Sequence, residues 1–271
     1  MSIRSNWQLI LLATAAMALT GCSEKDEHMA DKPVEEIYNQ AMDYYEEGKY
    51  ERAAKTFAEV ERQHPYSNWA VKSQLMSAYS YYESKRYDDA IEGFNVFIQL
   101  HPGHPDVAYA YYMLGLCYYE QVAMVERDQK STELAFKSFS EVLTRFPNSP
   151  YAKDAKLKID LLHTHLAGKE MEIGRFYLKK HAYLPALNRF KVVIEHYQTT
   201  SHAPEALHRA VECYLALGIL DQAQAMAAIL GHNYPGSQWY ADSYALIQPQ
   251  QQLVLLLGEL TWYLHAYLRR D

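Results

Sequence analysis

The sequence is short of positive charge and of cysteine. Its 271 residues include 26 Lys and Arg against 33 Asp and Glu, a net charge of −7. Phosphate contacts need a basic excess, so this balance argues against a nucleic-acid-binding protein. The sequence has only three cysteines and no Cys/His spacing typical of zinc, so we expect no metal site. Cys117 and Cys213 are predicted to be small buried residues rather than a disulfide.

Motifs that carry catalysis are also missing. There is no G-x-S-x-G, no H-E-x-x-H, and no Walker or Rossmann glycine pattern. His163 and His165 would stand about 200° apart on a helix, so their rings cannot share a metal ion. The sequence therefore predicts a protein that is not an enzyme.

What the chain does have is a repeat. The tyrosine doublets Tyr44-Tyr45, Tyr81-Tyr82 and Tyr118-Tyr119 lie 37 residues apart, and Tyr177-Leu178 and Tyr214-Leu215 are separated by the same 37. Each doublet follows a small residue and precedes an Ala, an aromatic or Ala, and usually a Pro. The members are Ala41, Ala53, Phe57, Pro65; Ala78, Ala90, Phe94, Pro102; Gly115, Ala135, Phe139, Pro147; Gly174, Ala186, Phe190; and Val211, Ala223, Ala227, Pro235.

This pattern resembles the tetratricopeptide repeat, in which small residues let two antiparallel helices approach closely and a proline ends the second helix. It predicts an all-α protein, an α-α superhelix of about five helix-turn-helix repeats. Few helix breakers occur between Ala152 and Gly174, so we expect one long helix there. That helix would divide the array into two lobes. Residues 34–150 would hold repeats 1–3, and residues 151–247 the connecting helix and repeats 4–5.

The N-terminus has the character of a targeting segment. Arg4 precedes a mostly apolar stretch from Trp7 to Leu19, and small residues then lead to Cys22. Residues 1–21 are predicted to be a signal peptide. The ending resembles the bacterial lipobox, in which the cysteine is lipidated. An ordinary signal with a chance cysteine is the alternative. Ser23 occupies the place where an aspartate would favour the inner membrane, and residues 22–33 are expected to form a flexible tether.

The C-terminal residues 248–271 depart from the repeat. Leu253 to Leu268 is nearly all apolar, but it is short for a bilayer span and contains Glu259. We expect an apolar helix that caps the end of the array. A helix that binds a partner or lies on a membrane surface is the alternative.

A binding groove is predicted on the concave face, which the first helix of each repeat lines. The second tyrosine of each doublet should face this groove and the first should be core. Tyrosine suits such a wall because it offers a large area and a hydroxyl, although the rings could instead pack on each other. The predicted groove residues are Tyr38, Met42, Tyr45, Leu75, Tyr79, Tyr82, Tyr112 and Tyr119.

Several interruptions of the repeat are more specific than the repeat itself. They are His101-Pro-Gly-His104-Pro105 before Tyr109–Gly115, the Asp128-Gln129 insertion before Ala135, Arg145–Tyr151 with Asp154-Ala155, and Ala186–Phe190. Together with the lipobox they resemble the BamD family, the repeat lipoproteins of the bacterial β-barrel assembly machinery.

The resemblance implies a non-enzymatic outer-membrane scaffold that faces the periplasm, with a covalent lipid on Cys22 and no other cofactor. It would recruit unfolded β-barrel precursors, dock the barrel subunit BamA and bind other lipoproteins of the complex. Asn188 and Arg189 match the segment expected near BamA. Two alternatives remain: a periplasmic repeat lipoprotein of cell-wall synthesis or division, and a binder of small ligands or sugar polymers.

Overall fold

The computed structural model describes residues 32–122 and 129–248. The predicted signal peptide, Cys22, nearly all of the tether and the apolar stretch from Leu253 to Leu268 lie outside these residues.

Within the described residues, all regular secondary structure is helical. Residues 238–248 continue the helical pattern after the last labelled helix. No helix in the described residues is both long and apolar enough to cross a membrane. The helices are α2 (Val34–Glu46), α3 (Tyr50–Gln63), α4 (Asn68–Glu83), α5 (Tyr87–Leu100), α6 (Val107–Glu120), α7 (Lys130–Arg145), α8 (Ala152–Lys179), α9 (Tyr183–His196), α10 (Ala203–Ala216) and α11 (Leu220–Asn233).

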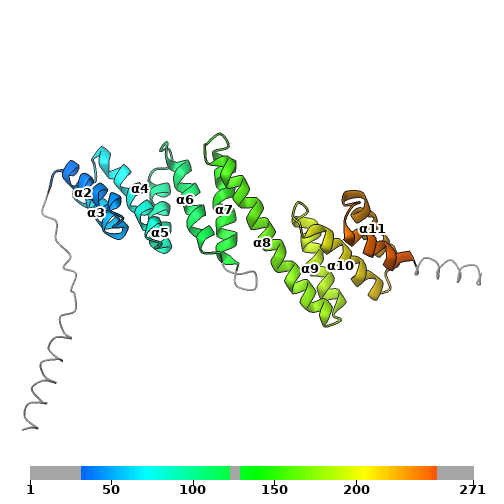
Figure 1. Ribbon diagram of the computed structural model, residues 1–271. Helices are drawn as coiled ribbons and strands as arrows, with labels where there is room; N and C mark the ends of the chain where they lie inside the picture. Colours follow the sequence, from blue (N-terminus) through cyan, green and yellow to red (C-terminus); the bar gives the residue numbers. More distant parts are fainter. Residues whose placement is uncertain (1–31, 123–128, 249–271) are drawn as a thin grey trace, which may run out of the picture.

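The helices stack in chain order into an elongated superhelix (Figure 1). Each helix packs against the next one from α2 to α11. The first helices of neighbouring repeats also touch, α2 with α4 and α4 with α6, and therefore form the inner layer. The predicted all-α superhelix of tetratricopeptide-type repeats is confirmed.

Small residues set the closest approach within repeats three and four. A Cβ added to Gly115 would lie 2.7 Å from the ring of Phe139, and one added to Gly174 would lie 2.4 Å from the ring of Phe190. Both phenylalanines are fully buried. The glycine slots of the sequence pattern are therefore the places where the second helix of the pair packs its aromatic ring against the first.

The turn inside a repeat places one residue in the left-handed backbone region. This residue is Gly48, Lys85, His181 or Gly218, with φ of 74°, 61°, 57° and 76°. Glycine adopts this conformation freely, whereas a side chain makes it costly by about 1–2 kcal/mol. The turn geometry therefore persists in two repeats that lack the glycine.

Helix α8 is the long helix that the sequence predicts, with 28 residues. Ile159 and Leu162 in its first half share a core with α6 and α7. Ala167 and Met171 in its second half belong to the core formed with α9, α10 and α11. Helix α8 therefore joins the core formed with α6 and α7 to the core formed with α9–α11. Figure 1 shows its oblique course between α7 and α9.

Candidate functional site

Six tyrosine rings form an unbroken series of contacts along the inner helices. Tyr45 lies 5.9 Å from Tyr79, and Tyr79 lies 6.3 Å from both Tyr82 and Tyr109. Tyr151, just before α8, lies 5.4 Å from Tyr109 and 5.3 Å from Tyr112, measured between ring centroids. All six rings are half-buried, so each keeps part of its surface in solvent. We call Tyr45, Tyr79, Tyr82, Tyr109, Tyr112 and Tyr151 the tyrosine wall.

Two of the predicted groove residues are core residues instead. Tyr38 is only 6% exposed and packs 4.6 Å from Trp69, and Leu75 is 9% exposed. The prediction was wrong for both because Tyr38 also packs against Phe57 of α3, and Leu75 belongs to the core cluster of Phe94 and Phe97. Met42 is partly buried against the same cluster as Tyr38. Tyr119 stands beyond the wall, 6.4 Å from Phe139.

In the first two doublets, the two tyrosines differ in the charges around them rather than in burial. The prediction that the first ring is core was wrong for Tyr44, Tyr81 and Tyr118, which are half-buried like the second rings. The Arg52 guanidinium lies 4.6 Å above the Tyr44 ring, and Arg86 lies 5.2 Å above Tyr81. In these two doublets an arginine therefore lies over the first ring, whereas the carboxylates of Glu83 and Glu120 act on the second rings.

Burial and nearby carboxylates raise the pKa values of three tyrosines of the wall. Burial raises the pKa of Tyr82 to about 12, with the negative charge of Glu120 as the next cause. Burial, followed by the carboxylate of Glu83, raises the pKa of Tyr79 further. The pKa of Tyr112 is also raised, first by burial and then by its hydrogen bond to Asp154. The hydroxyls of Tyr79, Tyr82 and Tyr112 therefore remain protonated at physiological pH and can donate hydrogen bonds.

Tyr151 was not among the predicted groove residues, although it belongs to the tyrosine wall. Its ring joins Tyr109 and Tyr112, which no helical spacing could predict because Tyr151 belongs to the α7–α8 loop. The tyrosines at the start of second helices were also missed as neighbours of the wall. Tyr50 lies 5.3 Å from Tyr45, and Tyr87 lies 5.8 Å from Tyr82. Their own 37-residue spacing was the available signal.

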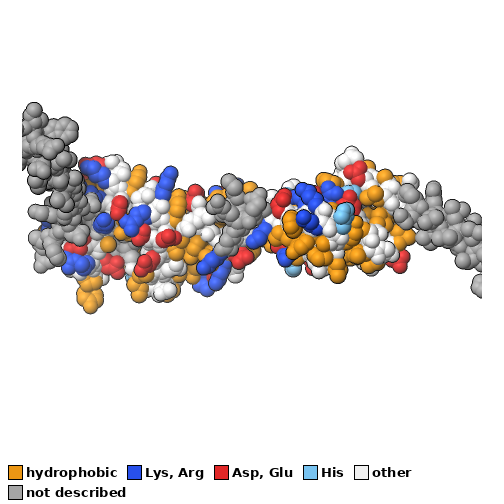
Figure 2. All heavy atoms as spheres, turned by 90° about the horizontal axis from the view of Figure 1, so that it is seen from below, with side chains coloured by type: hydrophobic (Ala, Val, Ile, Leu, Met, Phe, Trp, Pro, Cys, Tyr) orange, Lys and Arg blue, Asp and Glu red, His pale blue; other side chains and the backbone are white. Residues whose placement is uncertain are grey.

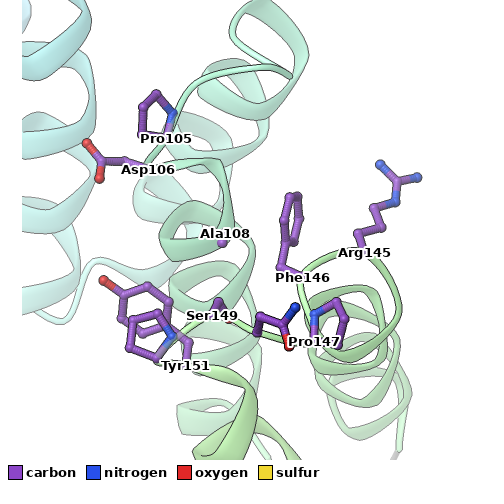
Figure 3. A pocket seen from close by; sticks show the side chains of 10 residues that line it. Pro105, Asp106, Ala108, Arg145, Phe146, Pro147, Ser149 and Tyr151 are labelled. Atoms are coloured by element: carbon purple, nitrogen blue, oxygen red, sulfur yellow. The ribbon is translucent and has the colours of Figure 1, made fainter.

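An open pocket of about 460 Å³ adjoins the wall at Tyr151. It lies between the start of α6 and the α7–α8 loop, and Phe146 and Pro147 form part of its lining. Figure 3 shows Tyr151 and Arg145 at opposite ends of this lining. One end of the tyrosine wall therefore borders this pocket at Tyr151.

A second candidate surface lies where α8 turns into α9. Phe176 and Leu184 are each 59% exposed, although both are large and apolar. Leu184 and the exposed Asn188 are four residues apart on α9 and so share a face. Figure 2 shows hydrophobic side chains gathered next to Lys and Arg side chains in the C-terminal half.

Arg189, the predicted docking arginine, already has a partner within the chain. Its Nη1 atom donates a hydrogen bond of 3.1 Å to Oε2 of Glu170 on α8. The Arg189 side chain is 44% exposed and that of Glu170 is 18% exposed. The guanidinium therefore keeps donors available to a second carboxylate.

A network of charged groups links α8 to α10, and the sequence analysis did not foresee it. Nη1 of Arg175 donates to both carboxylate oxygens of Glu205, at 3.0 and 2.9 Å. Arg209 pairs with Glu212 at 2.8 Å and lies 5.3 Å above the Trp239 ring. These contacts fix the orientation of α10 against its neighbours.

The cysteines behave as predicted. Cys117 and Cys213 are both free and fully buried, and burial raises the pKa of each thiol to about 12. The residues that the structure describes contain no group of His, Cys, Asp or Glu able to hold a metal ion.

A superhelix of helix pairs with an aromatic inner wall defines a tetratricopeptide-repeat protein, a class that binds other polypeptides. Residues 30–230 match the model of the YfiO family, described as outer membrane lipoprotein. The chain belongs to this family of outer membrane lipoproteins, and this membership associates it with the outer membrane.

The curated relatives carry the name outer membrane protein assembly factor BamD. The protein of Caulobacter vibrioides is 46% identical over 88% of this chain and 79% of its own length. That of Rickettsia prowazekii is 45% identical over 90% of this chain and 97% of its own length. Among solved structures, the tetratricopeptide-repeat domain of P58(IPK) aligns with 79% of this chain and 55% of its own, with a TM-score of 0.42 and 14% identity.

Proposed function

We propose that this chain is a non-enzymatic assembly factor for outer-membrane proteins. It recruits unfolded β-barrel precursors and holds the periplasmic domains of BamA beside them, together with other lipoproteins of the complex. A lipid on Cys22 anchors it to the outer membrane, and the repeats face the periplasm. Family membership and the names of the relatives support this role.

The tyrosine wall is the observation that carries the substrate-binding part of the proposal. Six half-buried rings in continuous contact form an aromatic surface that runs from α2 to the start of α8. An unfolded precursor exposes apolar side chains and unpaired backbone groups. Tyrosine rings cover the former, and their hydroxyls hydrogen-bond to the latter. A contiguous exposed aromatic surface of this kind is typical of a binding site.

Photo-crosslinking in cells tests the wall directly. A photoreactive phenylalanine analogue placed at Tyr45 or Tyr82 is expected to capture β-barrel precursors. The matched control is Tyr66, which is fully exposed in the α3–α4 loop and belongs to no part of the wall. If neither wall position captures more precursor than the control, the wall is not the substrate site.

The exposed face of α9 is the proposed docking site for BamA. Leu184 offers apolar area there, Asn188 offers an amide, and Arg189 offers a planar guanidinium that binds carboxylates through paired hydrogen bonds. The fixed contact to Glu170 preorients the Arg189 side chain, which lowers the entropy lost on binding.

A pull-down from detergent-solubilised membranes tests this docking. The wild-type chain is expected to co-purify an outer-membrane β-barrel protein, identified by mass spectrometry, and Arg189→Glu is expected to lose most of it. Lys137→Glu makes the same charge change on an exposed position of α7 and should have no effect. Recovery of cell-wall enzymes without a β-barrel protein would instead support the role in cell-wall synthesis.

Fractionation tests the anchor. The Cys22→Ala chain cannot be lipidated and is expected to leave the outer-membrane fraction. Its retention there at wild-type levels would refute a lipid anchor at Cys22. A second variant that also lacks residues 249–271 separates the anchor from the apolar C-terminal stretch.

A further inference from the structure

The tyrosine doublets are parts of a longer repeated unit that ends in a carboxylate. Each is followed by a glutamate, so Tyr-Tyr-Glu recurs at residues 44–46, 81–83 and 118–120. In repeats four and five the same place holds Lys179 and Ala216. The glutamate therefore occurs in repeats one to three, which contribute tyrosines to the wall, and is absent from repeats four and five, which contribute none.

Carboxylates line the wall in three dimensions as well. Asp154 accepts a hydrogen bond of 2.7 Å from the Tyr112 hydroxyl. Glu83 acts electrostatically on Tyr45, Tyr79 and Tyr82, and Glu120 acts on Tyr82. Three carboxylates from α4, α6 and α8 therefore converge on one aromatic surface.

Among the described residues, no cationic side chain is paired with these three carboxylates. Within residues 32–122 and 129–248, none of Glu83, Glu120 and Asp154 forms an ion pair. Other carboxylates are paired, as Glu170 of α8 is with Arg189 at 3.1 Å. The tyrosine wall therefore combines electron-rich rings with a local excess of negative charge.

Two tyrosine rings next to the wall already bind lysine ammonium groups of the protein. The Lys158 ammonium lies 4.4 Å from the centre of the Tyr119 ring, just beyond one end of the wall. The Lys72 ammonium lies 5.3 Å from the Tyr38 ring, beyond the other end. Ammonium groups in these positions are attracted by the negative face of the ring. Between the two lysines, no Lys or Arg of the described residues lies over a ring of the tyrosine wall.

We propose that the tyrosine wall selects extended segments in which a lysine or arginine lies next to an aromatic side chain. The aromatic side chain packs on the rings, and the cation is held by Glu83, Glu120 and Asp154 and by the ring faces. This inference rests on the proposed substrate role of the wall and adds the chemistry that the substrate must present. Opposite charges of this kind give selectivity more than raw affinity.

Calorimetric titration of the full mature chain with paired peptides tests the proposal. One ten-residue peptide alternates Phe and Thr and contains a central Lys, and its partner carries Gln at that position. The Lys peptide is expected to bind about five to ten times more tightly at low salt, with the difference shrinking as salt rises. In the triple variant Glu83→Gln, Glu120→Gln, Asp154→Asn, the two peptides should bind within about twofold of each other.

A control variant separates local selection from the overall negative charge of the protein. Glu92→Gln, Asp88→Asn and Asp89→Asn together remove three carboxylates from α5, outside the wall, and should leave the preference unchanged. Equal binding of both peptides by the wild type, or an unchanged preference in the triple variant, overturns the selectivity. Failure of both peptides to bind overturns the substrate role of the wall itself. The two failures are therefore distinct.

Discussion

The hydroxyl of Tyr112 on α6 donates a hydrogen bond of 2.7 Å to the carboxylate of Asp154 on α8. The two residues are 42 positions apart and tie the inner wall of repeat three to the first turns of the long helix. Tyr112→Phe removes only the hydroxyl. We expect the free energy of unfolding to fall by about 1–2 kcal/mol, because the acceptor is charged but partly solvated. Urea denaturation measures the change.

A double-mutant cycle isolates this hydrogen bond from the effects of each side chain alone. Asp154→Asn keeps the volume of the partner and removes its charge. Tyr112→Phe should cost less in the Asp154→Asn background than in the wild type. Additive effects of the two changes would show that the pair does not couple α6 to α8.

Alkaline pH is expected to destabilise the fold through the tyrosine wall. Burial and Glu120 raise the pKa of Tyr82 from 10.0 to about 12. Below pH 10 both the folded and the unfolded chain keep the Tyr82 proton, so its contribution to stability is intact. Between pH 10 and about 12 the unfolded chain releases this proton while the folded chain retains it, so the free energy of unfolding falls as pH rises.

Tyr82→Phe removes this titration and should flatten the pH dependence of unfolding in that window. Denaturation at a series of pH values from 9 to 12 measures the slope in both proteins. The same slope in wild type and variant would mean that Tyr82 titrates alike in the folded and unfolded chains.

The period of the sequence predicted the fold well because helix packing in a repeat depends on few, local positions. Two positions recur in register: the small residue of the first helix and the aromatic residue of the second helix. These are the residues that touch, as Gly115 and Phe139 do. The long helix α8 followed from a lack of helix breakers. These features depend on spacing along the chain, which the sequence displays directly.

The candidate site was predicted less completely because it depends on which way each ring turns. Tyr38 and Tyr45 both lie on α2, yet one is core and the other belongs to the wall. Tyr151 joins the wall from a loop whose path no periodicity describes. The charges that distinguish Tyr44 from Tyr45 come from arginines and carboxylates on other helices.

The turn at Lys85 offers a stabilising substitution. Lys85 has a φ of 61°, whereas the equivalent positions Gly48 and Gly218 adopt similar angles without a side chain. Lys85→Gly relieves the steric cost but increases the entropy of the unfolded chain, so the net gain should be about 0.5–1 kcal/mol. Thermal denaturation should show a higher Tm.

The reverse change serves as the control for this turn. Gly48→Ala meets no atom within 4 Å, so any loss of stability comes from the backbone angle alone. It should destabilise the protein by about 0.5–1 kcal/mol, because the lower entropy of the unfolded chain offsets part of the steric cost. A neutral Gly48→Ala would show that the first turn relaxes away from its positive φ.

The pair of Arg175 and Glu205 is expected to stabilise the C-terminal repeats. Arg175→Met removes both hydrogen bonds to Glu205, whose side chain is only 14% exposed, and should cost about 1–3 kcal/mol. Lys55→Met breaks an ion pair whose side chains are 54% and 50% exposed, and should cost less than about 0.5 kcal/mol. Chemical denaturation of both variants compares them. Equal costs would mean that α10 is held by its apolar contacts alone.

The tight approach at Gly174 makes this position intolerant of even one methyl group. In Gly174→Ala the new Cβ would lie 2.4 Å from the Phe190 ring, so α8 and α9 must move apart or the ring must leave its rotamer. Overpacking of this kind costs about 1–3 kcal/mol. The compensating variant Gly174→Ala with Phe190→Leu should recover part of the loss, because the smaller side chain gives the methyl group space. Urea denaturation of the single and double variants measures both effects, and a double variant less stable than either single change would show that the two residues do not share this contact.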